Sequence, residues 1–439
     1  MAVTDGGGNA PVSVSAPKVA YVTFGCKVNQ YDTQAIATAL EHAGAGTVQR
    51  EESPDVVVVN TCTVTTDADV EARRVIRQIS KRNPSAKIVV TGCYAEASSD
   101  VLRALPNVAH VSGNRGKAAL PAHVARLIGL DPGSPAPSEP CSSFHTPSRP
   151  REIWPILAGA DRMRGKTRAF MKLQDGCDYA CSFCIVPTVR GRSRSRPIPE
   201  LVTEAETLFR AGHRELVLCG VQLGSYGRDL GSCFEDALEA ILNVPGDFRV
   251  RISSLDPSDV TSRLIELLRS NPKLCPHLHL PIQSGDDGVL AAMRRRYRVA
   301  GIRQTVAALQ EAVPDIALSA DVLVGFPGES DEAYRRTLAL IEELGFMRLH
   351  VFPYAERPGT DAAEMPQMPR AIRYARCNEA IALSSRLETA FSARFAGREV
   401  RVLAESGGTA FSDHRIRFPA DGLNPGALTN RPLLTSIRP

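Results

Sequence analysis

Three cysteines lie close together in the middle of the chain, at Cys177, Cys181 and Cys184. Their CxxxCxxC spacing places three soft thiolates on one tight loop, which is the ligand type that an iron–sulfur cluster requires. A cubane [4Fe-4S] cluster bound by three cysteines keeps one iron open to a small molecule. A structural zinc loop is the alternative, but zinc prefers four closed protein ligands, and no fourth Cys or His lies nearby in the sequence. The spacing therefore favours a reactive iron–sulfur site.

Three further cysteines, Cys26, Cys62 and Cys93, each follow a short apolar segment. These segments, at 19–24, 55–60 and 87–92, alternate with amphipathic stretches at 30–43, at 67–81 and after Cys93 up to Leu105, a pattern typical of a parallel α/β sheet. Because ligands bind at the carboxyl ends of parallel strands, we expect the three thiols to converge. The alternative is that each thiol is an ordinary buried small side chain. We predict a second metal site on these cysteines.

A second α/β region surrounds the central cysteine loop. Strands are predicted, with helices such as 199–212 between them, at 169–174, 215–219, 249–253, 277–280, 317–324 and 348–352. About six βα units predict a partial (βα)6 barrel whose site lies at the carboxyl ends of the strands. Small and polar residues at those ends are candidates to bind a cofactor: Gly220, Gln222, Ser225, Ser253, Ser254, Gln283, Gly325 and Glu329.

Composition and periodicity divide the chain into five parts. We predict a disordered tail, an N-terminal open parallel α/β domain, a linker rich in Pro and Ser, the central barrel domain and a short basic β-rich module, at 1–17, 18–128, 129–164, 165–395 and 396–439. Cys141 lies in the linker, and we expect it to have no part in either metal site. The predicted fold class is therefore α/β.

The overall composition is that of a globular protein, with 43% hydrophobic residues and a net charge of +4 over 439 residues. Eleven cysteines without an apolar secretory segment predict reduced thiols in a cytoplasmic protein, and metal sites in place of a disulfide framework. No uninterrupted apolar run reaches about 18 residues, so no membrane span is expected. Without a sustained heptad pattern, a monomer is expected.

Two runs of arginine are candidate nucleic-acid contacts, because guanidinium groups bind phosphate in a bidentate manner and an aromatic ring stacks on a base. The candidates are Arg190, Arg192, Arg194, Arg196, Arg295 and Tyr297. A solvated basic face is the alternative interpretation of both runs. No general base is assigned, and packing or supporting roles are predicted for His213, His277, His279, His350, Cys219, Cys233, Cys275 and Cys377.

Taken together, these motifs resemble the methylthiotransferase branch of the radical S-adenosylmethionine (SAM) enzymes, from Lys18 to about Glu405. The resemblance rests on the central cysteine triplet and on the segments 25–30, 60–62, 91–93, 251–255, 279–285 and 321–329. The form Cys-Lys-Val-Asn-Gln at 26–30, Ile-Ser-Ser-Leu at 252–255 and His-Val-Phe-Pro-Tyr at 350–354 are most similar to the subfamily that modifies N6-threonylcarbamoyladenosine at position 37 of tRNA.

The resemblance implies two [4Fe-4S] clusters and two molecules of SAM. Cys177, Cys181 and Cys184 would hold the cluster that cleaves SAM reductively, and Cys26, Cys62 and Cys93 would hold a second cluster that delivers sulfur. A radical route suits the target, since the C2–H bond of adenine is neither acidic nor attached to a leaving group. The implied partners are tRNA, a one-electron reductant and a sulfur donor.

The chain departs from this family at its C-terminal end. Members usually end in an RNA-binding β-barrel module called TRAM, and about 40 residues after Arg398 are short for one. We therefore expect a reduced TRAM-like region, with tRNA contacts shared by the other domains. Sibling activities on N6-isopentenyladenosine in tRNA or on an aspartate of a ribosomal protein remain alternatives, as does a metal-stabilised RNA-binding protein without catalysis.

Overall fold

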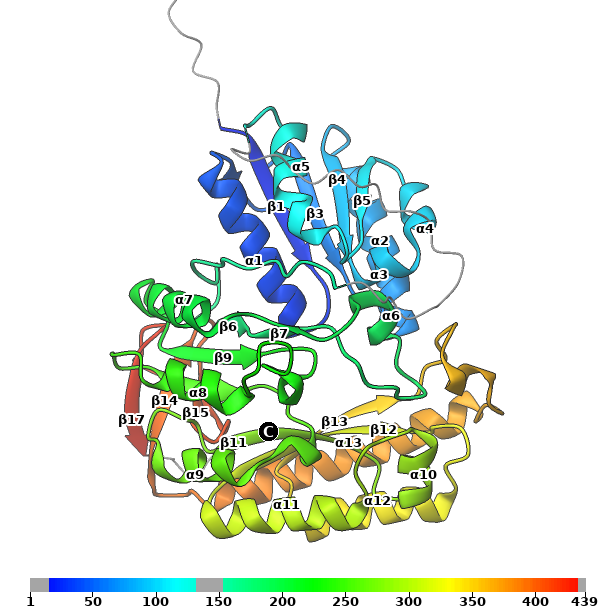
Figure 1. Cartoon of the computed structure of the whole chain (residues 1–439), viewed down its shortest axis with the longest axis vertical. Coiled ribbons are helices and arrows are strands. Elements are labelled where there is room, and N and C mark those ends of the chain that lie inside the picture. The colour runs from blue at the N-terminus through cyan, green and yellow to red at the C-terminus, as the bar shows by residue number, and fades with distance from the viewer. Residues whose placement is uncertain (1–15, 132–152, 433–439) are drawn as a thin grey trace, which may run out of the picture.

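The computed structural model describes residues 16–131 and 153–432 (Figure 1). Nearly all of the predicted tail and most of the predicted linker, including Cys141, lie outside the described residues. None of the described helices is long and apolar enough to cross a membrane. The predicted α/β class is confirmed, with parallel sheets in the first two thirds of the chain and an antiparallel sheet at its end.

The N-terminal sheet is parallel throughout and has the strand order β2-β1-β3-β4-β5. Its strands are β1 (Lys18–Thr23), β2 (Gly46–Thr47), β3 (Val56–Thr61), β4 (Lys87–Gly92) and β5 (Val108–Ser112). Every residue of the valine-rich β3 is buried, because helices cover both faces of the sheet. One face packs on α1 (Lys27–His42) and α5 (Leu120–Leu127), and the other on α2 (Thr66–Arg82) and α4 (Ser99–Arg103).

The central region is a partial barrel of two three-stranded parallel sheets, β6-β9-β10 and β11-β12-β13. The strands are β6 (Ala169–Lys172), β9 (Glu215–Cys219), β10 (Arg249–Ile252), β11 (His277–Gln283), β12 (Ala317–Val324) and β13 (Arg348–Pro353). A hydrogen bond of 3.0 Å from the Leu255 amide to the His279 carbonyl joins the two sheets. The outer helices are α7 (Ile198–Arg210), α8 (Phe234–Leu242), α9 (Ser262–Ser270), α11 (Val299–Ala312), α12 (Asp331–Glu343) and α13 (Arg370–Ala393).

Short elements complete the regions around the cysteines. Next to the N-terminal sheet lie α3 (Cys93–Ala97) and a 3-10 turn at Lys117–Ala119, and after β6 come β7 (Gln174–Asp175), α6 (Val186–Arg190) and β8 (Arg194–Ser195). The helix α10 (Asp287–Ala292) follows β11. In Figure 1 the N-terminal sheet lies above the barrel, and α6 lies at the boundary between them beside α3.

The C-terminal module is a four-stranded antiparallel sheet of order β16-β15-β14-β17. This agrees with the short β module that the sequence predicts. It consists of β14 (Glu399–Glu405), β15 (Thr409–Ser412), β16 (Arg417–Pro419) and β17 (Leu428–Pro432). Arg249, at the start of β10, anchors it through an ion pair of 2.7 Å to Asp413 and a hydrogen bond of 2.9 Å to the Phe411 carbonyl. The module therefore docks at the amino ends of the barrel strands, the end opposite the predicted site.

Candidate functional site

The three N-terminal cysteines follow three neighbouring strands of the parallel sheet. Cys26 precedes α1 after β1, Cys62 follows β3, and Cys93 begins α3 directly after β4. Pairing of Thr23 with Asn60 and of Thr61 with Gly92 aligns the ends of these strands. Cys62 and Cys93 are buried, whereas Cys26 is exposed.

The residues beside these cysteines fix the loops that carry them. The Asn29 side-chain amide donates to the carbonyls of Phe24 and Thr61, both at 2.9 Å, and thereby joins the loops after β1 and β3. Gly25 has φ +84°, and a Cβ atom there would lie 2.7 Å from the Cys62 sulfur. Only glycine permits both this conformation and this close approach. The Gly-Cys and Asn-Thr-Cys motifs are thus parts of one hydrogen-bonded edge.

The other cysteine triplet lies on the loop between β7 and α6. The Cys177 amide donates to the Gly191 carbonyl at 3.0 Å, and Ser182 binds the turn after α10 through its amide and its hydroxyl group, at 3.1 and 2.8 Å. Two donors approach the sulfurs: the Tyr179 amide lies 3.4 Å from the Cys177 Sγ, and an Arg295 guanidinium nitrogen lies 3.3 Å from the Cys181 Sγ. Such donors stabilise thiolate sulfur and tune a bound cluster.

The electrostatics of both triplets fit a bound cluster of cationic irons. Burial, followed by the charge of Cys93, raises the pKa of the Cys62 thiol to about 12. Burial also raises the pKa of Cys177 to about 11 and that of Cys184 to about 12, and Cys181 adds to both shifts. Burial thus disfavours the thiolate form of these side chains, and a bound metal cation would offset that cost.

The helix α6 contacts both cysteine sites, because it follows the central cysteine loop and packs on α3. Asn114 donates to the Val189 carbonyl of α6 at 2.8 Å, and its amide nitrogen lies 3.4 Å from the Cys93 sulfur. Arg190, the last residue of α6, donates to the Asn29 side chain at 2.5 Å. Burial lowers the pKa of its guanidinium, but the charges of Asp175, Cys93 and Cys26 help to raise it well above its usual range. The two triplets therefore belong to one continuous structure.

A buried network of charges ties the sheet to the barrel beneath this helix. Asp32 of α1, fully buried, pairs with Lys117 at 2.9 Å and with Lys172 of β6 at 2.5 Å. Asp175 pairs with Arg190 at 2.7 Å and also lies 3.3 Å from Lys172 and 3.6 Å from Arg194. Asp32 accordingly joins cations of both regions, whereas the cations on Asp175 all belong to the barrel region, so Asp32 ties the barrel to the N-terminal sheet.

A cavity of about 220 Å³ lies beside Cys184, between the central cysteine loop, the inner wall of the barrel and the loop after β3. Val64 and Thr65, which closely follow Cys62, form one side, and Cys184 with its neighbours forms another. The barrel contributes Gln283, Asp321, Leu323, Phe352, Pro353, Tyr354, Ala355 and Arg357. Gln283 has φ +62°, a conformation that is rare outside glycine and is often found at functional sites. A reactant held here would contact Cys184 and the residues that closely follow Cys62.

The candidate cofactor residues occupy the strand ends, but only Gln283 is among the described residues that line this cavity. Gly220, Gln222, Ser225, Ser253 and Ser254 follow β9 and β10 on the facing side of the barrel, where the Gln222 amide donates to the Gln174 side chain at 2.8 Å. Glu329 accepts from the Gly325 amide at 2.7 Å and from Arg376 at 2.6 Å. Gly325 and Glu329 therefore stabilise their own loop, and Glu329 also joins that loop to α13 through Arg376.

The structure corrects the expected tRNA contacts. Five of the six candidates are directed inward and have protein partners: Arg190, Arg194, Arg196, Arg295 and Tyr297. The reason is that these side chains neutralise buried carboxylates from other segments, such as Glu204 and Asp256. Arg192 remains exposed, and Arg294, Arg296 and Arg298 of the second run are also exposed.

Sequence reasoning missed a polar group on the inner wall of the barrel. Asp321 of β12 lies 2.9 Å from the His279 Nε2 and 3.5 Å from the His350 Nδ1. The histidines seemed isolated in the sequence, but they belong to the adjacent strands β11 and β13, whose register places His279 and His350 on either side of β12. The parallel pairing of these three strands is the signal from which this polar group could have been predicted.

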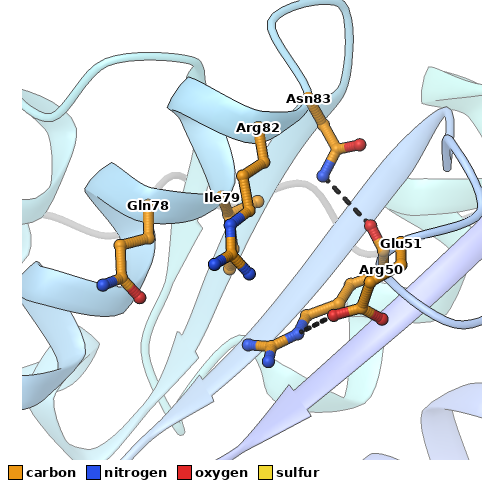
Figure 2. Close-up of a pocket in the computed structure, with 6 residues that line it drawn as sticks. All are labelled: Arg50, Glu51, Gln78, Ile79, Arg82 and Asn83. Atoms are coloured by element: carbon orange, nitrogen blue, oxygen red, sulfur yellow. Dashed lines mark hydrogen bonds and ion pairs between the residues drawn. The ribbon is translucent and has the colours of Figure 1, made fainter.

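A second hollow lies at the opposite end of the N-terminal sheet (Figure 2). It is lined by Arg50, Glu51, Gln78, Ile79, Arg82 and Asn83, from the segment before β3 and from the end of α2. Arg50 pairs with Glu51 at 2.8 Å, and the Asn83 amide donates to the Arg50 carbonyl at 3.1 Å. This hollow is at the amino edge of the sheet, away from the cysteines, so it has no direct part in their chemistry.

Comparison with known proteins identifies two families along the chain. Residues 18–113 match an uncharacterized protein family (UPF0004), and residues 171–341 match the radical SAM superfamily. Proteins named threonylcarbamoyladenosine tRNA methylthiotransferase MtaB are 36% identical in Thermotoga maritima, over 87% of this chain and 85% of the relative, and 38% identical in Bacillus subtilis, over 88% and 84%. A tRNA-2-methylthio-N(6)-dimethylallyladenosine synthase of Cereibacter sphaeroides is 35% identical over 92% and 93%.

Solved structures share the fold. The radical SAM methyltransferase TsrM from Kitasatospora setae aligns with a TM-score of 0.56 and 20% identity, over 79% of this chain and 75% of that chain. The cobalamin-dependent radical SAM enzyme OxsB aligns with a TM-score of 0.51 and 11% identity, over 84% and 56%.

Proposed function

Because this chain belongs to the family of radical SAM tRNA methylthiotransferases, we propose that it inserts a methylthio group at C2 of N6-threonylcarbamoyladenosine at position 37 of tRNA. The substrate follows from the named relatives and from the Cys-Lys-Val-Asn-Gln and His-Val-Phe-Pro-Tyr motifs. The observation that supports the reaction best is the single cavity bordered by the neighbours of Cys62 and by Cys184.

Cys177, Cys181 and Cys184 would hold one [4Fe-4S] cluster, and Cys26, Cys62 and Cys93 would hold the other. When bound, the two clusters supply the electron for reductive cleavage of SAM and a site from which sulfur is delivered. Each triplet has three protein sulfurs and adjacent amide or guanidinium donors, which suits a cluster with one iron open to a further ligand.

The other residues of the cavity bind, orient and exclude water. Phe183, Leu323 and Tyr354 form an apolar wall next to Cys184, and Phe326 packs edge to face on both aromatic rings. An apolar wall keeps water away from reactive species and strengthens electrostatic interactions in the cavity. Arg295 holds the Cys181 side of the loop, because its guanidinium also pairs with the buried Asp256 at 2.5 Å. SAM would lie between Gln283 and the residues that follow β9 and β10.

The tRNA would approach over the exposed rim of the central loop. Arg192, Arg294, Arg296 and Arg298 present positive charge there, and the Arg296 guanidinium lies 4.8 Å from the centre of the Tyr179 ring. Phosphate contacts of this kind position a nucleic acid without reading its sequence. The C-terminal sheet, at the other end of the barrel, would take a smaller part than a full RNA-binding module.

We also propose a one-electron reductant and a sulfur donor as partners, because the reaction requires both. A monomeric state and a cytoplasmic location are proposed because the sequence favours them. It also retains the five-part division of the chain, with boundaries at 17, 128, 164 and 395. This division is supported by the sheet topology, because the strands of the N-terminal sheet, the barrel and the C-terminal sheet belong to separate sheets.

The test is nucleoside mass analysis of tRNA from cells with and without the gene. We expect the methylthio form of threonylcarbamoyladenosine to vanish and its parent to accumulate. A purified Cys26→Ala/Cys62→Ala/Cys93→Ala variant should lose about half of its iron, retain SAM cleavage and form no methylthiolated product. Product from this variant would contradict the assigned roles, and loss of the dimethylallyl derivative instead would contradict the substrate.

A further inference from the structure

The second half of α2 concentrates positive charge on the surface of the N-terminal region. Residues 73–82 contain five cations and no acidic residue: Arg73, Arg74, Arg77, Lys81 and Arg82. We call these five residues the α2 stripe. The whole chain has a net charge of +4, so the residues outside the stripe are together close to neutral. The net positive charge of the protein is therefore matched by this one segment of helix.

The stripe lies on one side of an amphipathic helix. The buried residues of α2 pack against the N-terminal sheet: Ala72, Val75, Ile76 and Ile79. Arg77 and Lys81 follow Arg73 at intervals of four residues, the spacing at which side chains are neighbours along a helix surface. An open hollow of about 480 Å³ lies on this surface and is lined by Val70, Arg73, Arg74, Arg77, Gln78 and Lys81. Closely spaced cations thus border a hollow that faces solvent.

Most of the stripe has no partner within the part of the chain that the structure describes. Arg73 donates a hydrogen bond to the Tyr94 hydroxyl group, and Arg74 pairs with Glu71 at 2.5 Å. In residues 16–131 and 153–432, three exposed cations of the stripe have neither a hydrogen bond nor an ion pair: Arg77, Lys81 and Arg82. These three charges are available to a ligand from solution.

The stability of the helix explains only part of this arrangement. Lys81 and Arg82 occupy the last turn of α2, where positive side chains interact favourably with the helix dipole. Arg77 lies before that turn, and three of its four neighbours at spacings of three and four residues are cations. Like charges at these spacings destabilise a helix. The stripe therefore lowers the stability of α2 unless an anion from outside the protein binds to it.

The stripe leads away from the cavity beside Cys184. Val64 and Thr65, which line the cavity, directly precede α2. At a rise of 1.5 Å per residue, Arg73 lies about 12 Å and Arg82 about 25 Å from Thr65 along the helix axis. Arg82 lines the hollow at the far end of the helix (Figure 2). An RNA whose target base reaches the cavity carries its neighbouring phosphates over distances of this size.

We propose that the α2 stripe binds the phosphate backbone of the anticodon stem of tRNA, an inference that rests on the proposed function. A backbone with one negative charge per nucleotide is the ligand that matches a row of unpaired guanidinium and ammonium groups. Such contacts position the RNA and do not read its sequence. The stripe is separate from the rim of the central loop, so the RNA would be held from both the N-terminal sheet and the barrel.

The experiment measures Kd as a function of salt concentration for two RNAs. One is an anticodon stem-loop that carries threonylcarbamoyladenosine, and the other is a short single-stranded oligonucleotide centred on the same nucleotide. Reconstituted wild-type enzyme is compared with the neutralised variant Arg77→Gln/Lys81→Gln and with the charge-conserving variant Arg77→Lys/Lys81→Arg. Iron content and SAM cleavage without RNA report whether each variant retains its clusters.

The matched control removes two exposed cations from another surface. Arg335→Gln/Arg386→Gln changes the net charge by the same amount, on α12 and α13. These helices lie at the lower edge of the molecule in Figure 1, whereas α2 lies in its upper part. A general effect of net charge would appear in both neutralised proteins, whereas a contact on α2 would appear in one.

We expect the neutralised α2 variant to bind the stem-loop roughly 5- to 30-fold more weakly near 0.1 M salt. The slope of log Kd against log salt should fall by roughly 1 to 2, because two phosphate contacts are lost. The short oligonucleotide, the charge-conserving variant and the control should show wild-type behaviour, and kcat at saturating stem-loop should stay within about twofold. An unchanged Kd and slope for the stem-loop, or an equal loss for the short oligonucleotide, would overturn the proposed surface.

Two further outcomes separate the surface from the function on which it rests. A wild-type enzyme that neither binds nor modifies the stem-loop would overturn the proposed function and the surface together. A wild-type enzyme that modifies it, with a neutralised variant of equal affinity, would overturn the surface alone. If that variant also cleaves SAM more slowly with reduced flavodoxin, an acidic electron carrier, but not with dithionite, the stripe belongs to a protein partner instead of RNA.

Discussion

Replacement of Asp32 by Asn tests the buried charge network that joins the N-terminal sheet to the barrel. The substitution keeps the shape of the side chain and removes its negative charge. Lys117 and Lys172, which are 4% and 1% exposed, would then lie in the interior without their shared carboxylate. Because Lys117 belongs to the N-terminal region and Lys172 to β6, the substitution weakens the contact between the two regions.

The expected loss of stability follows from two arguments. Breaking a buried ion pair by removing one partner costs about 3 to 5 kcal/mol, since an uncompensated charge remains. Burial alone would raise the pKa of Asp32, but Lys117, Lys172 and Arg190 outweigh it and lower the pKa from 3.8 to about 2. At 1.36 kcal/mol per pKa unit, this shift corresponds to about 2 kcal/mol. We expect a loss of about 2 to 5 kcal/mol, or roughly 2 to 5 °C in Tm for a chain of 439 residues.

The pH dependence has a definite sign. Because the pKa of Asp32 is lower in the folded protein than in the unfolded chain, its contribution is complete above pH 3.8 and is lost as the pH falls towards 2. Near pH 7 the Asp32→Asn variant therefore shows the whole deficit. Its stability should also depend less on pH in the acid range than that of the wild type.

The assay is anaerobic thermal and urea unfolding at pH 7, with Glu71→Gln as the control. Glu71 pairs with Arg74 on the surface of α2, where removing a pair costs at most about 1 kcal/mol. Lys117→Met in the Asp32→Asn background should recover part of the loss, because it removes one of the uncompensated cations. A stability of Asp32→Asn within about 0.5 kcal/mol of the wild type would refute the reasoning.

Two further predictions concern the tRNA surface and a histidine pair. Arg192→Glu should weaken tRNA binding several-fold and reduce its dependence on salt, whereas Arg210→Glu, at a more exposed position on α7, should have little effect. Equal effects of the two substitutions in filter binding would argue against the rim as the contact surface. Burial, with the charge of His123, lowers the pKa of His110 to about 4, so the folded protein should lose stability as the pH falls from 6.5 to 4. A His110→Phe variant should lose less in urea titrations across that range, and an unchanged decline would exclude this histidine as the cause.

Much of the fold is predictable from the sequence because its strands are short, buried and rich in branched residues. The predicted segments 215–219 and 317–324 coincide with β9 and β12. The edge shared by Cys26, Cys62 and Cys93 followed from the same pattern, since the ends of parallel strands lie side by side. Periodicity and strand topology were sufficient for these features.

The side chains of the interface were not predictable in the same way. Arg190, Arg194 and Arg196 form a basic run that resembles a nucleic-acid surface. Their carboxylate partners Asp32, Asp175 and Glu204 lie outside this run, on other segments of the chain. Charge patterning cannot reveal that a carboxylate from a different segment is buried opposite a guanidinium. The group of Asp321, His279 and His350 was missed for the same reason, because the register of three strands brings it together.

The network around α6 has unequal numbers of opposite charges. Within residues 16–131 and 153–432, Lys117, Lys172, Arg190 and Arg194 face two carboxylates, those of Asp32 and Asp175. The surplus is positive, and it lies next to Cys26 and Cys93, whose thiolates act on Arg190. Three thiolates around a [4Fe-4S] core of charge 2+ would carry one net negative charge, which would offset part of this surplus. Loading of the N-terminal cysteines would then also strengthen the attachment of the N-terminal sheet to the barrel, so the loaded protein should resist proteolysis better than the protein without iron.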